Sequence, residues 1–252
     1  MKNFRTAGAL LVALYTYCAG AIAGTVSVAV AANFADPVQR IAAAFEQATG
    51  HKADVSLGAT GKFYAQIRNG APFDVLLSAD EDTPRKLEEE GAAVASTRFV
   101  YAVGKLVLWS PKPGVVDDRG AVLGGGNFEH LAICNPKLAP YGAAAVETMK
   151  ALGSYDRLAA TFVEGENISQ AYQFVATGNA QLGFVALSQV MQDGKLRAGS
   201  AWIVPQSLYR PLRQAALLLD HGKDNAAARA WLDWLRRDDT KALIRGYGYE
   251  TP

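Results

Sequence analysis

The sequence predicts an α/β protein with two lobes, and three observations support this fold class. A unit of strand, short loop and helix recurs along the chain, which is typical of α/β construction. Residues 73–78 (FDVLLS) have the near-continuous apolar pattern of a strand in a parallel sheet that helices cover on both faces. A long β-rich segment, 99–109, interrupts the unit, and the unit then starts again in what we expect to be a second lobe.

The N-terminal residues have the pattern of a secretory signal peptide. Lys2 and Arg5 precede an apolar run that ends in the small-residue pattern Ala21-Ile22-Ala23. This pattern predicts export and cleavage after Ala23, so that residues 1–23 are absent from the mature protein. A retained membrane anchor is the alternative, but the apolar run is close to the lower length limit for crossing a bilayer.

The first lobe begins with a strand over 25–31, where apolar residues alternate along TVSVAVA. A helix over 37–48 follows, because its apolar residues recur with helical spacing. We expect Asp36 as the N-cap of this helix and Gly50 at its end. The unit then repeats twice, with strands over 53–57 and 73–78 and helices over 62–69 (closed by Gly70) and 83–90.

The β-rich segment 99–109 is interpreted as a strand that crosses from the first lobe to the second. Beyond a glycine-rich loop at 124–126 the unit returns, with strands over 131–134, 162–164 and 182–185 and helices over 141–152 and 168–177. A return strand over 209–219 and an amphipathic helix over 225–236 complete the chain. We therefore expect lobe 1 to comprise residues 24–103 and 206–252, and lobe 2 to comprise residues 104–205.

Composition argues against several classes of function. Hydrophobic residues make up 50% of the chain and charged residues 19%, as in an ordinary globular protein. The formal net charge is +1 and the Lys and Arg residues are scattered, so no nucleic-acid partner is expected. His51, His130 and His221 lack the spacing of zinc ligands. Cys134, which alone remains after export, is expected to pack in a strand and not to act as a nucleophile.

Four loops lead from a strand into a helix, and we expect the four helix starts to converge on one cleft. The loops are 32–36, 58–62, 136–141 and 164–168. A helix N-terminus presents unpaired N–H groups and the positive end of its dipole, so it accepts an anion without a formal cation. Asn33, Thr60 and Tyr141 add amide and hydroxyl donors in these loops. The alternative is that the three residues only cap helices or set turns.

Three other candidates are weaker. The segment 58–62 (GATGK) differs from a nucleotide phosphate loop, because two residues instead of four separate its glycines and Phe63 follows the lysine. Lys62 is expected to point into solvent more readily than toward an anion. Asp74 and Asp80 flank a buried strand, where capping and salt bridging are commoner than acid–base catalysis.

Four segments of the chain resemble periplasmic molybdate-binding proteins of ABC importers: AVAANFADPVQRIAAAF, GATGKFYAQIRNGAPFDVLLSAD, NPKLAPYGAAAVETMKALG and ENISQAYQFVATGNAQLGFV. The stretches 70–80 and 245–249 also follow the family's order. The resemblance covers nearly the whole mature chain. It implies the type II periplasmic binding protein fold, in which each lobe is a mixed sheet flanked by helices and the ligand cleft lies between the lobes.

The resemblance also implies a function. It indicates a periplasmic monomer, not an enzyme, that binds molybdate and tungstate without a cofactor and passes the oxyanion to a membrane permease. The oxyanion ligands carried over from the family are Asn33, with Ala32 as a backbone contact, Thr60, Tyr141 and Ile168. Molybdenum is therefore expected only as the bound oxyanion. Ala186 stands where the family often has Tyr, and Tyr141 is the candidate for the compensating hydroxyl.

Other functions stay open at the level of sequence. The ligand is alternatively sulfate, phosphate or a phosphonate, and a protonated phosphate would need a carboxylate acceptor. Asp36 and Glu164 are the candidates for that acceptor. An exported sensor domain that binds an oxyanion is a second alternative. A secreted enzyme is a third, but it would require converging titratable residues that the four loops do not offer.

Overall fold

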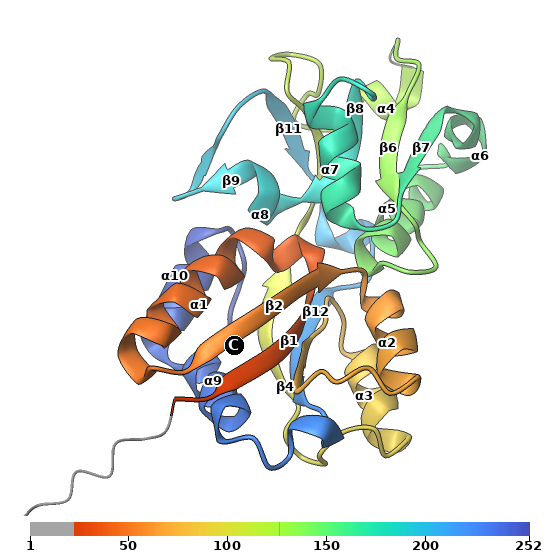
Figure 1. Ribbon diagram of the computed structural model, residues 1–252. Helices are drawn as coiled ribbons and strands as arrows, with labels where there is room; N and C mark the ends of the chain where they lie inside the picture. Colours follow the sequence, from red (N-terminus) through yellow and green to blue (C-terminus); the bar gives the residue numbers. More distant parts are fainter. Residues whose placement is uncertain (1–22, 126) are drawn as a thin grey trace, which may run out of the picture.

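The computed structural model describes residues 23–125 and 127–252 (Figure 1). Apart from Ala23, the predicted signal peptide lies outside the described residues. None of the helices formed by these residues combines the length and the apolar character that crossing a bilayer requires.

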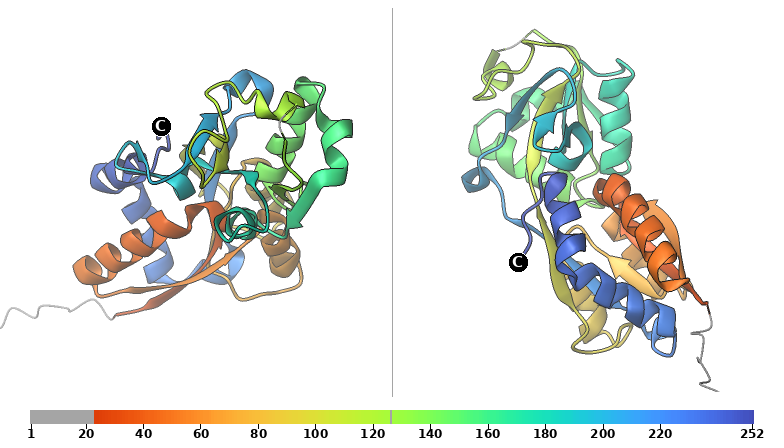
Figure 2. Two further views of the ribbon diagram at one scale, coloured as in Figure 1. Left: turned by 90° about the horizontal axis from the view of Figure 1, so that it is seen from above. Right: turned by 90° about the vertical axis from the view of Figure 1, so that its left-hand side faces the viewer.

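The described chain folds into two lobes, each built around a five-stranded mixed sheet (Figures 1 and 2). The first sheet has the strand order β2-β1-β3-β12-β4, with β1 at Thr25–Ala31, β2 at Lys52–Gly58, β3 at Val75–Leu77, β4 at Phe99–Gly104 and β12 at Leu212–Leu218. The second has the order β11-β5-β8-β6-β7, with β5 at Leu106–Ser110, β6 at Leu131–Cys134, β7 at Phe162–Gly165, β8 at Leu182–Ala186 and β11 at Ser200–Ile203. The predicted two-lobed α/β fold is confirmed.

Each sheet is mixed because one strand, the one by which the chain arrives from the other lobe, runs antiparallel to its neighbours. In the first sheet β1 runs parallel to β2 and β3, whereas β12 is antiparallel to β3 and β4. In the second sheet β6 runs parallel to β7 and β8, whereas β5 is antiparallel to β8 and β11. The parallel strands bring the starts of their following helices to one edge of each sheet.

Helices cover both faces of the first sheet. Val26, Val28 and Val30 of β1 pack against α1 (Ala35–Thr49), α9 (Ala226–Arg236) and α10 (Asp238–Gly246). Ala29 and Leu76 face the opposite way, toward α2 (Thr60–Arg68) and α3 (Asp82–Glu89). The alternation of side chains along a strand therefore divides the core of this lobe into two layers.

The second lobe has the same arrangement. One face of its sheet packs against α5 (Pro140–Ala151), and the other packs against α7 (Ile168–Ala176) and α8 (Leu187–Val190). Smaller elements complete it: α4 (Val122–Gly125), α6 (Tyr155–Leu158), β9 (Met191–Gln192) and β10 (Lys195–Leu196), with 3-10 turns at Ala159–Thr161 and Gln206–Leu208. Both lobes thus present helix starts toward the space between them (Figure 1).

The predicted crossing strand is divided between the two sheets. β4 ends at Gly104 in the first sheet and β5 begins at Leu106 in the second, so the chain passes between lobes at Lys105. It returns between β11 and β12. The last residues rejoin the first sheet, where Val103 and Glu250 exchange backbone hydrogen bonds of 2.7 and 3.0 Å.

Several local predictions were wrong. Asp36 is not the N-cap of α1, because a 3-10 turn, Ala32–Phe34, precedes the helix and moves its start to Ala35. Gly124 and Gly125 of the expected glycine loop instead form the end of a single helical turn, α4 (Val122–Gly125). Gly126 lies outside the described residues. The return strand starts at Leu212 and not at Tyr209. α10, the β9–β10 hairpin and β11 were not predicted.

We predict that Leu76→Ala lowers the free energy of unfolding by about 2–5 kcal/mol, because Leu76 is fully buried between β3 and the helices α2 and α3. Leu57→Ala is the matched control, since Leu57 lies on edge strand β2 with 46% of its surface exposed and should change stability by less than about 0.5 kcal/mol. Urea denaturation measures both values, and equal losses would contradict the assigned core.

Candidate anion-binding site

The four loops meet around one small cavity between the lobes. It is small, with a free volume of about 10 Å³, which corresponds to about one water molecule. Its lining residues are Ala31, Ala32, Asn33, Gly58, Ala59, Thr60, Ala79, Ala139, Pro140, Tyr141, Asn167 and Ile168. All five residues predicted as ligands, including Ala32, therefore lie around the same space. Three of the four expected helix starts meet there, whereas the first loop contributes the 3-10 turn Ala32–Phe34 and not the start of α1.

Three helices begin at this cavity with unpaired backbone donors. α2 starts at Thr60 after the extended residue Ala59, α5 starts with Pro140 and Tyr141, and α7 starts at Ile168. In the described chain, the N–H groups of Thr60, Tyr141 and Ile168 have no acceptor, as expected in a first helical turn. The positive ends of three helix dipoles accompany these donors.

Two hydroxyl groups, one from each lobe, add further donors. Thr60 Oγ1 accepts a hydrogen bond from the N–H of Ala79 at 3.1 Å, and Tyr141 Oη accepts one from Gln214 Nε2 at 3.2 Å. Neither hydroxyl hydrogen has an acceptor among residues 23–125 and 127–252. Burial raises the pKa of Tyr141 well above its ordinary value, so this phenol keeps its hydrogen.

The side chain of Asn33 is already engaged within the protein. Its Nδ2 donates to Gln214 Oε1 at 2.8 Å and to Tyr249 Oη at 2.9 Å. The carbonyl of Asn33 accepts from Ser188 Oγ and from Tyr249 Oη, each at 2.8 Å. These contacts hold the first loop in place, and they leave the backbone N–H of Asn33 as its simplest contribution to a ligand.

Sequence reasoning missed Gln214, Tyr249 and Ser188, which surround Asn33 and are all buried. Gln214 and Tyr249 are 181 and 216 positions away from Asn33 along the chain. Tyr249 closes the stretch 245–249 that resembles the family, but no role was inferred for it, and Gln214 is a polar residue on the buried part of the strand LRQAALL. That position was the available signal, since a buried amide requires hydrogen-bond partners.

No charged side chain lines the cavity among the described residues. Lys62 instead pairs with Glu166 at 2.6 Å, and Asp36 pairs with Arg197 at 2.9 Å. Both ion pairs join the two lobes at the rim and are largely exposed, so each contributes little to stability. Glu164 accepts from Asn135 Nδ2 at 2.6 Å. A ligand in the cavity would therefore meet neutral donors and no carboxylate.

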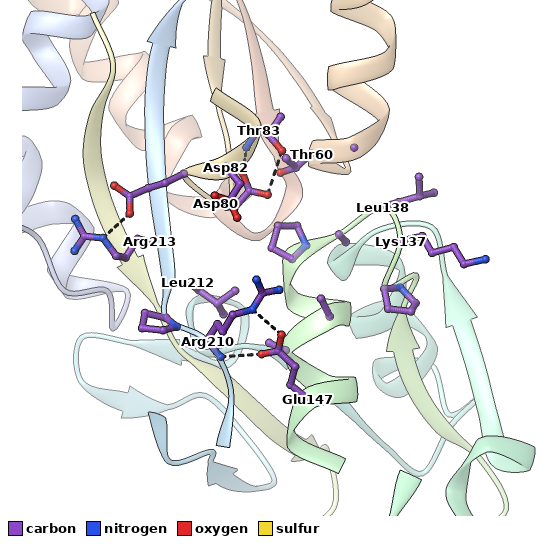
Figure 3. Close-up of a pocket in the computed structure, with 18 residues that line it drawn as sticks. Thr60, Asp80, Asp82, Thr83, Lys137, Leu138, Glu147, Arg210, Leu212 and Arg213 are labelled. Atoms are coloured by element: carbon purple, nitrogen blue, oxygen red, sulfur yellow. Dashed lines mark hydrogen bonds and ion pairs between the residues drawn. The ribbon is translucent and has the colours of Figure 1, made fainter. Parts of the chain in front are cut away.

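A groove of about 320 Å³ adjoins the cavity and shares Thr60, Ala139 and Pro140 with it (Figure 3). Arg210 pairs there with Glu147 at 2.8 Å, and Arg213 pairs with Glu81 at 2.6 Å. The groove therefore shares part of its wall with the cavity, and two of its arginines are paired with glutamates.

The other titratable candidates have structural partners. Asp80 accepts from the N–H of Thr83 at 2.9 Å and so caps α3, while burial raises its pKa. Asp74 accepts from the N–H of Ser27 at 2.8 Å and contacts His221 at 2.9 Å. Both aspartates thus have hydrogen-bond partners within the protein. The described residues contain no cluster of His, Cys, Asp and Glu side chains suited to a metal cation.

Comparison with known proteins assigns the family. A model of the bacterial extracellular solute-binding protein family matches residues 26–250, which is nearly the whole described chain. The chain belongs to this family. The solute-binding protein family thereby explains the two lobes and the small cavity between them, and no catalytic group is required.

Similar proteins within the solute-binding protein family are named for molybdate. The molybdate-binding protein ModA of Azotobacter vinelandii is 60% identical over 227 residues, which cover 90% of each chain. ModA of Rhodobacter capsulatus is 54% identical over 231 residues, covering 92% of this chain and 90% of the relative. A solved structure of a periplasmic molybdate-binding protein from Azotobacter vinelandii matches with a TM-score of 0.87 and 42% identity, covering 90% of this chain and 99% of that one. The resemblance noted in the sequence motifs is confirmed.

We predict that Cys134 of the folded protein resists thiol reagents near neutral pH. It is buried at the end of β6, and burial raises its pKa to about 12, so the reactive thiolate is scarce. Modification should be slow in the folded chain starting at Gly24 and complete after denaturation, as followed by a chromogenic disulfide reagent. Rapid labelling of the folded chain would contradict the burial of this thiol.

Proposed function

We propose that this solute-binding protein captures molybdate, and also tungstate, in the cavity between its lobes and delivers the oxyanion to the permease of an ABC importer. The observation that carries the proposal is the set of unpaired neutral donors around one cavity: the N–H groups of Thr60, Tyr141 and Ile168 and the hydroxyls of Thr60 and Tyr141. The names of its relatives support molybdate as the ligand.

In this proposal each predicted residue has a role. Ala32 and Asn33 contribute backbone contacts, and Ile168 contributes its N–H group at the start of α7. Thr60 and Tyr141 contribute both an N–H and a hydroxyl group. The Tyr141 hydroxyl compensates for the tyrosine that Ala186 replaces at the end of β8.

The donor set suits a fully deprotonated dianion. Preorganised N–H and O–H groups stabilise negative charge strongly in a site from which water is excluded. A protonated phosphate needs an acceptor for its own hydrogen, but Asp36 and Glu164 bond to other residues and do not line the cavity. Sulfate shares the charge and shape of molybdate, so cavity size distinguishes the two anions, because metal–oxygen bonds are longer than sulfur–oxygen bonds.

We propose that capture occurs by closure of the lobes, 24–103 with 206–252 against 104–205, around the anion. Direct hydrogen bonds between the lobes favour the closed arrangement. Ser169 Oγ donates to the carbonyl of Ala32 at 3.1 Å, and the N–H of Gly61 donates to the carbonyl of Leu138 at 2.8 Å. An anion that contacts both lobes adds to these bonds and shifts the population toward the closed state. The mature protein acts as a monomer in the periplasm after cleavage behind Ala23.

We predict that molybdate and tungstate raise the melting temperature of the anion-free protein, whereas sulfate and phosphate do not. An anion at about a hundredfold over its Kd adds about 2.7 kcal/mol, which corresponds to roughly 5–10 °C for a protein of this size. Differential scanning fluorimetry with each anion at equal concentration measures the shift. Stabilisation by sulfate or phosphate alone would contradict the choice of molybdate.

We predict that Thr60→Val raises the Kd for molybdate roughly ten- to hundredfold, because a hydrogen bond to a charged group contributes about 1.5–3 kcal/mol. Thr177→Val is the matched control, since Thr177 is exposed and its hydroxyl donates to the carbonyl of Gln173. Lys62→Met should change Kd by less than about twofold, because its ion pair lies at the exposed rim. Calorimetric titration measures all three, and a larger effect at Lys62 than at Thr60 would contradict a neutral site.

A further inference from the structure

Gln214 joins the two lobes behind the cavity. It is fully buried on β12, at a shift in the register with β4 between Gln214 and Ala215, and irregularities of this kind re-aim side chains. Its Oε1 accepts from Asn33 Nδ2 at 2.8 Å, and its Nε2 donates to Tyr141 Oη at 3.2 Å. Because Asn33 belongs to lobe 1 and Tyr141 to lobe 2, one amide contacts a cavity-lining residue from each side.

The Asn33 carbonyl and the Ser188 hydroxyl together set the direction of these hydrogen bonds. Ser188 Oγ donates to the Asn33 carbonyl at 2.8 Å, and Tyr249 Oη donates to the same carbonyl at 2.8 Å and to Ser188 Oγ at 3.0 Å, so the tyrosine hydrogen is directed toward these two acceptors. Tyr249 Oη is then left to accept from the Asn33 side chain at 2.9 Å. The atom of Asn33 on that side is therefore the amide nitrogen Nδ2 and not the oxygen.

The same reasoning continues to Tyr141. Because Nδ2 of Asn33 only donates, the Gln214 atom 2.8 Å from it is the acceptor Oε1. The other end of the Gln214 amide is the donor Nε2, which points to Tyr141 Oη. Tyr141 Oη must accept this bond, so its own hydrogen is directed away from Gln214 and is available to a ligand.

The space for this contact depends on Gly104, the last residue of β4. A Cβ atom at this position would overlap Tyr141 Oη and Gln214 Nε2. Gly104 immediately precedes the crossing to lobe 2, so the backbone between the lobes passes directly beside the Gln214–Tyr141 bond. The absence of a side chain here lets an α5 residue of lobe 2 reach a β12 residue of lobe 1.

We infer that Gln214 is a positioning residue that determines the specificity of the cavity, because it makes the Tyr141 hydroxyl a hydrogen-bond donor to the oxyanion. This inference rests on the proposed function. A wall that only donates matches an anion whose oxygens carry no hydrogen. If the Gln214 side chain accepted from Tyr141 instead, the tyrosine would present a lone pair to the ligand, and the oxyanion would be repelled.

Two substitutions at Gln214 separate this role from simple attachment of the lobes. Gln214→Met keeps the length of the side chain, adds no charge and removes the donor. Gln214→Glu keeps a partner for Tyr141 but reverses the bond, since a carboxylate accepts the tyrosine hydrogen. Calorimetric titration with sodium molybdate measures Kd for both variants, for Tyr141→Phe and for each double variant, and circular dichroism verifies that the ligand-free proteins fold.

We expect Tyr141→Phe to raise Kd roughly tenfold or more in the wild-type background, and by less than about twofold beside Gln214→Glu. Gln214→Glu should raise Kd more than Gln214→Met while Tyr141 is present. The difference in Kd between Gln214→Glu and Gln214→Met in the Tyr141→Phe background measures charge repulsion alone. This difference should be smaller than the difference in Kd between the two variants when Tyr141 is present. Gln66→Glu and Gln66→Met, at an exposed position of α2, are the matched controls and should leave Kd unchanged.

Three results would overturn the inference. One is a Tyr141→Phe effect that is absent, or equal in all backgrounds, since independent sites give multiplicative changes in Kd. Another is weaker binding by Gln214→Met than by Gln214→Glu, the order expected if Gln214 only ties the lobes together. The third applies if Gln214→Glu does not fold. The double-mutant cycle with Gln214→Met then decides alone, and the inference fails if Tyr141→Phe raises Kd as much in the Gln214→Met background as in the wild type. A wild-type protein that does not bind molybdate would instead refute the proposed function.

Discussion

Helix N-termini buried between two closed lobes need an acceptor for their free N–H groups. At the cavity the N–H groups of Thr60, Tyr141 and Ile168 have none within the described chain, and the two hydroxyl hydrogens nearby have none either. Unpaired buried donors are costly, so this arrangement is stabilised when a small anion supplies the missing acceptors. The two sheets of the fold place these helix starts on either side of the cavity.

The neutrality of the site has a physical consequence for selectivity. Several charges at the rim and in the groove are paired within the protein, as in Lys62–Glu166 and Arg213–Glu81, and no charged side chain of the described residues lines the cavity itself. Discrimination then depends on the direction of each hydrogen bond and on the size of the enclosed space. The hydrogen-bonded group around Asn33 and Gln214 holds the side chains behind the cavity and so fixes the direction of these bonds.

The same hydrogen-bonded group connects ligand binding to the backbone between the lobes. Gln214 lies on the strand that re-enters the first sheet, and Gly104 lies on the strand that leaves it. If capture occurs by closure as proposed, a change in the separation of the lobes alters the contact between Gln214 and Tyr141. In that mechanism, packed polar atoms couple binding to closure in addition to the anion itself.

The sequence by itself predicted the α/β class, the two lobes and the approximate positions of most helix starts, because strand alternation, helical spacing and capping residues act over a few positions. It also marked Asn33, Thr60 and Tyr141 as polar loop residues, whereas Ala32 and Ile168 were expected only from the family resemblance. It did not reveal the 3-10 turn before α1, which displaced Asp36 from its expected N-cap, or the use of both Asn33 amide hydrogens inside the protein. Those features depend on Gln214 and Tyr249, which are 181 and 216 positions from Asn33. Only the tertiary structure decided them, because the direction of a buried hydrogen bond is set by whichever partners the packing brings within reach.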